Sequence, residues 1–167
     1  ALISPTLGAV ADHRGHKKLF LIISMIIGVI GTGTLAFVQA GDWLMASIVY
    51  GFAMMAFNAS SVFCDSLLPF VAKKANLDFA SSLGYSMGYL GGGILFALNV
   101  VMYLKPELFG FSSGVAAVQF SFLSVAIWWF VFSIPLMIYV NEPKPTDLKS
   151  KNWLDLTRST LADLKKT

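Results

Sequence analysis

The fold class is decided by an uncharged stretch at residues 108–141, LFGFSSGVAAVQFSFLSVAIWWFVFSIPLMIYVN. A helix that crosses a lipid bilayer needs about 20 mostly apolar residues, and this stretch is longer than that. A helix on the surface of a soluble protein carries charged residues on one face, whereas this stretch has none. The stretch therefore predicts a transmembrane helix.

Three other stretches have the same character, at residues 19–41, 43–64 and 79–104. We therefore expect an all-α integral membrane protein with four complete transmembrane helices. Their expected bounds are about 19–39, 44–71, 80–104 and 114–140, within a membrane region at 19–143.

The overall composition agrees with this class. Of the 167 residues, 56% are hydrophobic and only 13% are charged, whereas about a quarter of a soluble domain is charged. This balance argues against a disordered chain, a nucleic-acid-binding module and a secreted disulfide scaffold. The expected partner is a lipid bilayer, with no nucleic acid.

The two ends of the chain differ from the membrane region. Residues 1–11 are apolar but too short to cross a bilayer, so we expect the inner end of a truncated transmembrane helix. Residues 144–167 place leucines on one side of a helix and lysines elsewhere, which predicts a cytoplasmic amphipathic linker.

Lysine and arginine set the expected orientation. Eleven of the twelve lie in the segment 12–18, the segment 72–78 or the tail after residue 141, and the other is Lys105. Because basic residues accumulate on the cytoplasmic side, we place those three segments in the cytoplasm. The protein is then a multi-pass protein of a bacterial inner membrane or of an organelle membrane.

One predicted helix carries a polar stripe. Asn58, Ser61 and Asp65 are spaced by three and four residues, which places them on one helical face. Asp65 could bind a substrate cation, carry a proton or pair with a basic residue. Alternatively it lies at the cytoplasmic headgroups, because it follows Trp43 by 22 residues, about 33 Å of helix. These three residues are the candidate cavity residues.

Small residues form a second pattern. Gly84, Gly88 and Gly92 are spaced by four and share a face with Asn99. Such a face lets two membrane helices approach closely, either as a moving contact or as static packing. We expect a helix interface there.

The sequence offers little for catalysis. No histidine accompanies Cys64 or any serine within a predicted span, so a nucleophile–base pair is not expected. His13 and His16 lie in the first basic loop, where solvation is more common than metal binding. We expect no enzymatic activity, no cofactor and no metal.

The first loop, residues 12–18, contains a spaced motif. A glycine precedes an acid by four residues, a second glycine follows the acid by three, and basic residues follow: Gly8, Asp12, Arg14, Gly15 and Lys17. An acid at this place can accept hydrogen bonds from a neighbouring helix N-terminus, and the glycine permits a tight turn. Such a loop could latch two helix bundles together on the cytoplasmic side.

That spacing resembles the signature loop of the major facilitator superfamily, with His13 and His16 where the family usually has basic residues. The stretches NASSVFCDSLLP (58–69), SSLGYSMGYLGGG (81–93) and SFLSVAIWWFVFSIP (121–135) resemble the branch related to the autophagy-type vacuolar amino-acid effluxers, which includes bacterial members.

The resemblance implies a twelve-helix secondary transporter, of which this chain covers the end of helix two to helix six. It implies alternating access for a small solute, such as an amino acid or related metabolite. The motif loop would then be the cytoplasmic gate, and the remainder of the transporter would be a partner. A non-transporting membrane scaffold or assembly subunit is the alternative.

Overall fold

The computed structural model describes residues 16–39 and 41–141. Four α-helices dominate this part of the chain: α2 (Lys17–Thr34), α3 (Trp43–Val71), α4 (Leu77–Leu104) and α5 (Gly114–Tyr139). Short 3-10 turns follow three of them: η1 (Leu35–Phe37), η2 (Lys74–Asn76) and η3 (Pro106–Phe109). No strand occurs among these residues, and each α-helix is long and apolar enough to cross a membrane. The prediction of an all-α protein with four transmembrane helices is confirmed.

The largest difference from the expected bounds is at the end of α2. A helix was expected to continue to residue 39, but α2 ends at Thr34 and only one 3-10 turn follows it. The Thr34 hydroxyl donates a hydrogen bond of 2.8 Å to the Ile30 carbonyl oxygen, a contact that often bends a helix. Gly41 then takes a φ of 105°, which a side chain would disfavour, and the chain turns into α3.

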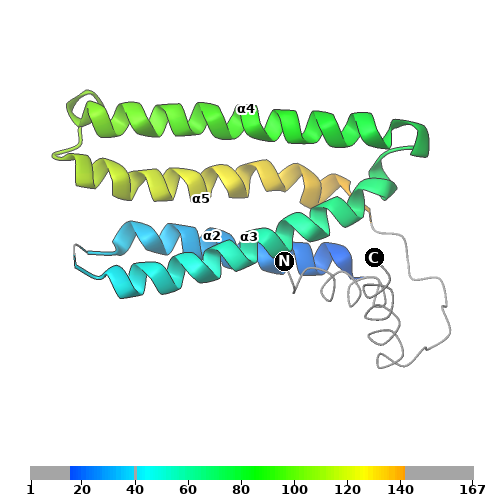
Figure 1. Ribbon diagram of the computed structural model, residues 1–167, viewed down its shortest axis with the longest axis horizontal. Coiled ribbons are helices and arrows are strands. Elements are labelled where there is room, and N and C mark those ends of the chain that lie inside the picture. Colours follow the sequence, from blue (N-terminus) through cyan, green and yellow to red (C-terminus); the bar gives the residue numbers. More distant parts are fainter. Residues whose placement is uncertain (1–15, 40, 142–167) are drawn as a thin grey trace, which may run out of the picture.

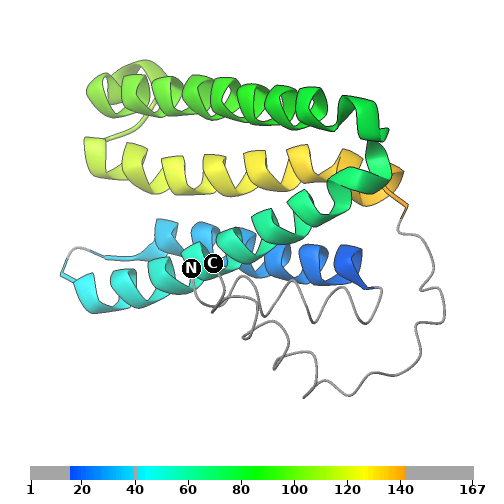
Figure 2. The ribbon, with the colours of Figure 1, turned by 45° about the vertical axis from the view of Figure 1, so that its right-hand side comes forward.

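The helices form an antiparallel bundle in the spatial order α3, α2, α5, α4 (Figure 1). α2 packs against α3 on one side and α5 on the other, and α5 packs against α4. The second view again shows α5 between α4 and the α2–α3 pair (Figure 2). α3 and α4 converge where η2 joins them and are separated by α5 at their other ends (Figure 1).

Small residues explain the close packing of α2. A Cβ atom added at Gly31 would lie 3.2 Å from the Cβ of Ala53 on α3, so glycine permits this approach. Gly28 faces the ring of Trp129 on α5, which also makes an edge contact with Phe57 at 5.5 Å. Trp129 therefore packs against both α2 and α3.

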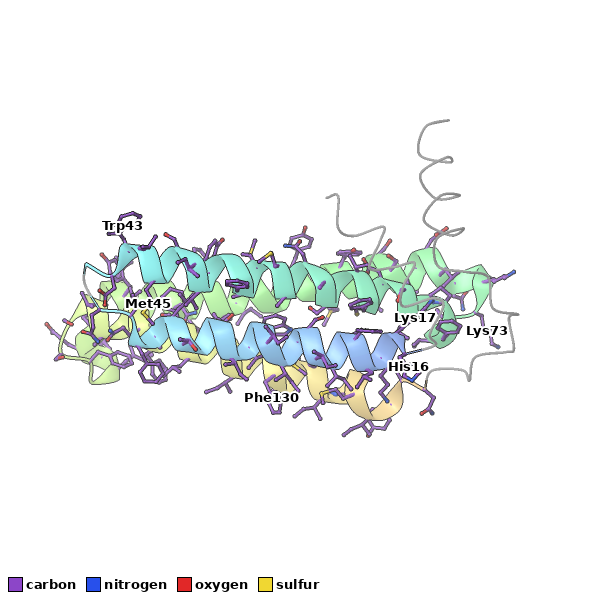
Figure 3. All side chains as sticks on the ribbon, turned by 90° about the horizontal axis from the view of Figure 1, so that it is seen from below. His16, Lys17, Trp43, Met45, Lys73 and Phe130 are labelled. Carbon is purple, nitrogen blue, oxygen red and sulfur yellow. The ribbon has the colours of Figure 1, made fainter. Side chains whose placement is uncertain are left out.

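Most of the described basic residues lie at one end of the bundle, whereas Lys105, which follows α4, lies at the other. Figure 3 shows His16, Lys17 and Lys73 together at one end and Trp43 and Met45 at the other. The Lys17 ammonium lies 5.3 Å from the centre of the Phe70 ring. We call the end with Lys17 and Lys73 the inner end, following the predicted orientation, and the Trp43 end the outer end.

Most large apolar side chains lie on the outside of this four-helix bundle. The buried cluster near the inner end is small and consists of Leu21, Phe63 and Leu67, while Met102 is the buried residue of α4. A surface this apolar is suited to lipid or to further membrane helices rather than to water.

Candidate functional site

A hollow of about 470 Å³ lies between α3 and α4, and all four helices contribute to its wall. We call this hollow the α3–α4 groove. Its wall is mainly aromatic and aliphatic, with few polar groups and no charged residue. The residues that line it are Thr32, Leu35, Tyr50, Ala53, Met54, Phe57, Gly92, Leu95, Phe96, Asn99, Phe122, Val125, Trp128 and Trp129.

The groove lies near the expected centre of the bilayer. Its α3 residues, from Tyr50 to Phe57, follow Trp43 by 7 to 14 positions, roughly 10–21 Å along the helix. The apolar part of a bilayer is about 30 Å thick, so this range brackets its middle. Secondary transporters hold their solutes at this depth.

The polar end of the groove on α4 is fixed by a hydrogen bond between helices. The Ser124 hydroxyl of α5 lies 3.0 Å from Asn99 Oδ1, to which it can donate, and 2.8 Å from the Ser121 carbonyl oxygen. Asn99, which the sequence placed at a helix interface, thus lies between α4 and α5 and also lines the groove.

The three-glycine face of α4 is open in this part of the chain. A Cβ atom added at Gly84, Gly88 or Gly92 would meet no atom within 4 Å, although Gly92 lines the groove. The glycine that faces α5 is Gly91, where an added Cβ would lie 3.8 Å from the Trp128 ring. The described helices therefore leave the Gly84–Gly88–Gly92 face without a packing partner.

Asp65 has a partner that the sequence did not suggest. The Tyr85 hydroxyl of α4 donates a hydrogen bond of 3.2 Å to Asp65 Oδ2, which links α3 to α4. Tyr85 precedes Gly92 by seven residues, two helical turns, so it shares the stripe of α4 that lines the groove. The sequence signal that could have identified Tyr85 is its position seven residues before Gly92, on the same face of the helix.

The register between the antiparallel helices places the other candidates relative to this bond. Asn58 lies seven residues outward from Asp65 on α3, and Gly92 lies seven residues outward from Tyr85 on α4. Asn58 is therefore about level with Gly92. Its side-chain amide is exposed and donates a 2.7 Å hydrogen bond to the Met54 carbonyl oxygen one turn away.

Ser61 lies in a different place from Asp65. It lines a smaller hollow of about 150 Å³ formed by α2, α3 and α5, together with Cys64 and Ser133. Its hydroxyl donates a 3.0 Å hydrogen bond to the Phe57 carbonyl oxygen of its own helix. The structure therefore brings Asp65 together with Tyr85 and places Ser61 toward the interior of the bundle.

The remaining predicted site residues lie in the first loop. Gly8, Asp12, Arg14 and Gly15 are outside the described residues, and Lys17 begins α2. Within residues 16–39 and 41–141, no group of three or more histidine, cysteine or acidic residues is placed to hold a metal ion. These observations leave the α3–α4 groove and the Asp65–Tyr85 pair as the candidate site.

Comparison with known proteins identifies the kind of molecule that carries this site. A family model described as "Vacuole effluxer Atg22 like" matches residues 1–78 and 76–167. The uncharacterized MFS-type transporter YxiO of Bacillus subtilis (strain 168) is 32% identical over 143 residues, which make up 85% of this chain and 33% of that protein. The chain thus spans about a third of the length of this curated relative. No solved structure matches the chain.

These matches agree with the motifs and with the four membrane-spanning helices. They confirm the resemblance to the major facilitator superfamily and to its effluxer branch, and they point to a transporter rather than an enzyme. The protein is an integral, multi-pass membrane protein. The chain belongs to the Atg22-like vacuole effluxer family of major facilitator transporters.

Proposed function

We propose that this chain forms part of a secondary transporter that moves a small solute, such as an amino acid or related metabolite, by alternating access. The α3–α4 groove is one wall of the solute path, and Asn58 and Asp65 are polar residues along it. The rest of the transporter supplies the opposite wall, as in a twelve-helix bundle with two rocking halves. The motif loop from Gly8 to Lys17 serves as the cytoplasmic gate.

The observation that carries this proposal is the placement of Asp65. Residues 43–64 and 79–104 contain no charged residue. The Asp65 carboxylate directly follows the first of these stretches, bonds to Tyr85 of α4 and lies inward of the α3–α4 groove. Ionisable groups within membrane helices are costly and usually face a partner or a water-filled path. Asp65 follows Trp43 by 22 residues, roughly 33 Å of helix, which places it near the inner end of the bundle, where a water-filled path would open to the cytoplasm. Family membership supports the same proposal.

A cysteine reporter in the groove tests alternating access. Gly92 lines the groove and has room for a side chain, so Gly92→Cys can be placed in a cysteine-free version of the full-length transporter. Reconstituted vesicles are then treated with a membrane-impermeant maleimide from either side. We expect labelling from both sides, because the groove opens to each side in turn.

Gly91→Cys is the matched control. Gly91 is the neighbouring residue, but it faces the Trp128 ring and is half-buried, so its labelling should be slow from both sides. Labelling of the Gly92→Cys protein from one side only, under every condition, would contradict alternating access. That result would favour the scaffold or assembly role.

A further inference from the structure

We propose that Tyr85 is the positioning partner of Asp65 and that their hydrogen bond closes the inner end of the α3–α4 groove. This inference rests on the proposed transport function and adds the residue pair that controls one end of the path. Tyr85 donates and Asp65 Oδ2 accepts, at 3.2 Å.

The geometry of the two helices makes this bond a closure. α3 and α4 converge toward the inner end, where η2 connects them, and diverge toward the outer end (Figure 1). The bond lies six residues from the end of α3 and eight from the start of α4, roughly 9–12 Å outward from the connection. The groove begins at Phe57 on α3 and Gly92 on α4, farther outward again. The Asp65–Tyr85 pair therefore lies between the groove and the inner end.

The chemistry of the pair suits a contact that opens and closes. A hydroxyl–carboxylate hydrogen bond is normally 2.5–2.7 Å long, so a separation of 3.2 Å indicates a weak bond. Both side chains are exposed on the described bundle, and water can replace either partner when the helices separate. The bond thus holds the carboxylate toward α4 and adds to opening at most the cost of one ordinary hydrogen bond.

The neighbouring residues do not duplicate this link. Tyr89 lies one turn outward on α4 and is 81% exposed, and it makes no hydrogen bond among the described residues. Cys64 precedes Asp65 but lines the hollow between α2, α3 and α5. Within the described chain, Tyr85 is the one side chain that hydrogen-bonds to the Asp65 carboxylate.

The test uses the Gly92→Cys reporter in the full-length transporter and measures labelling from the inner side. Tyr85→Phe keeps the ring and removes the donor, so the rate of labelling should rise about fivefold. That factor corresponds to ~1 kcal/mol, the typical net contribution of one hydrogen bond. Labelling from the outer side should not rise. Tyr89→Phe, the matched control, should leave both rates unchanged.

A double-mutant cycle separates closure from a merely structural role. Asp65→Ala should raise inner labelling as Tyr85→Phe does, and the double variant should show no further increase because both changes remove the same bond. Equal inner labelling in the parent and Tyr85→Phe proteins, or fully additive effects, would overturn the inference. This readout is independent of solute transport. If Tyr85→Phe raises labelling from the inner side but Gly92→Cys is never labelled from the outer side, the proposed transport function is refuted. The role of the Asp65–Tyr85 bond in closing the groove is then still supported.

Discussion

Among the glycines of the described helices, Gly28 has the closest neighbour, and Gly28→Ala is the change that tests this contact. A Cβ atom there would lie 2.2 Å from Trp129 Cη2 and 2.6 Å from Cζ3. Ordinary contact begins at 3.4 Å, so the ring would have to move by about 1.2 Å. The Trp129 ring also makes an edge contact with Phe57 of α3.

The magnitude follows from how freely the ring can move. Overpacking a well-filled site costs about 1–3 kcal/mol. Trp129 borders both the α3–α4 groove and the smaller hollow, so it can tilt into space on either side. We therefore expect the lower part of that range, a loss of about 1–2 kcal/mol in the free energy of unfolding.

The assay is SDS titration of the full-length transporter in mixed micelles, followed by far-UV circular dichroism. Gly51→Ala is the control for the intrinsic helix preference of alanine, because Gly51 is helical and has no atom near its added Cβ. The expected difference between the two variants is about 1–2 kcal/mol.

A second change identifies the clash itself. The Trp129 atoms near the added Cβ are Cη2, Cζ3 and Cζ2, at the far end of the indole. The shorter phenylalanine side chain has no atoms there. Gly28→Ala should therefore cost much less in a Trp129→Phe background than in the parent. Equal stability of the Gly28→Ala and Gly51→Ala proteins would refute the packing described for α2 and α5.

Two further predictions use the same titration. Ser124→Ala should lower the free energy of unfolding by about 1 kcal/mol, because it leaves Asn99 Oδ1 without its donor. The Ser121 hydroxyl bonds within its own helix, so Ser121→Ala should cost less. Equal losses in the two variants would count against the α4–α5 link. Gly110→Ala should cost about 1–2 kcal/mol, because Gly110 has a φ of 77° after η3. Gly93→Ala, at an open helical position, should not be destabilising, and the same loss at both glycines would contradict the left-handed turn.

The helices were predictable from the sequence because lipid imposes a simple requirement. Every backbone polar group within the bilayer must be bonded inside the protein, so a long uncharged stretch has few alternatives to a helix. Local hydrogen bonds are harder to predict. Hydropathy does not reveal that α2 gives way to a 3-10 turn after Thr34, whose hydroxyl bonds to the Ile30 carbonyl oxygen.

The candidate site was less predictable because spacing gives a face but not its neighbour. Asn58, Ser61 and Asp65 have helical spacing, yet Ser61 lies toward α2 and α5 while Asp65 faces α4. Which helix lies against each side of α3 depends on the packing of the whole bundle. Tyr85 shares a helical stripe with Gly92, but that spacing does not identify Asp65 as its hydrogen-bond partner.

The same limit applies to the glycines. The regular spacing of Gly84, Gly88 and Gly92 drew attention to one face of α4, but the contact with α5 is made at Gly91, the adjacent residue. On α2, the close contacts at Gly28 and Gly31 depend on Trp129 and Ala53, which lie far away in the sequence. A glycine pattern therefore indicates that a helix can be approached closely without saying by what.

The central claim is that the Asp65 carboxylate, between the α3–α4 groove and the inner end, serves solute movement, and Asp65→Asn tests it most directly. Uptake of individual radiolabelled amino acids is measured in vesicles that contain equal amounts of folded full-length protein, parent or variant. For an amino acid that the parent protein transports, we expect the variant to lose most of the uptake while its folded yield changes little. Uptake by the Asp65→Asn protein at the parent rate would contradict the claim.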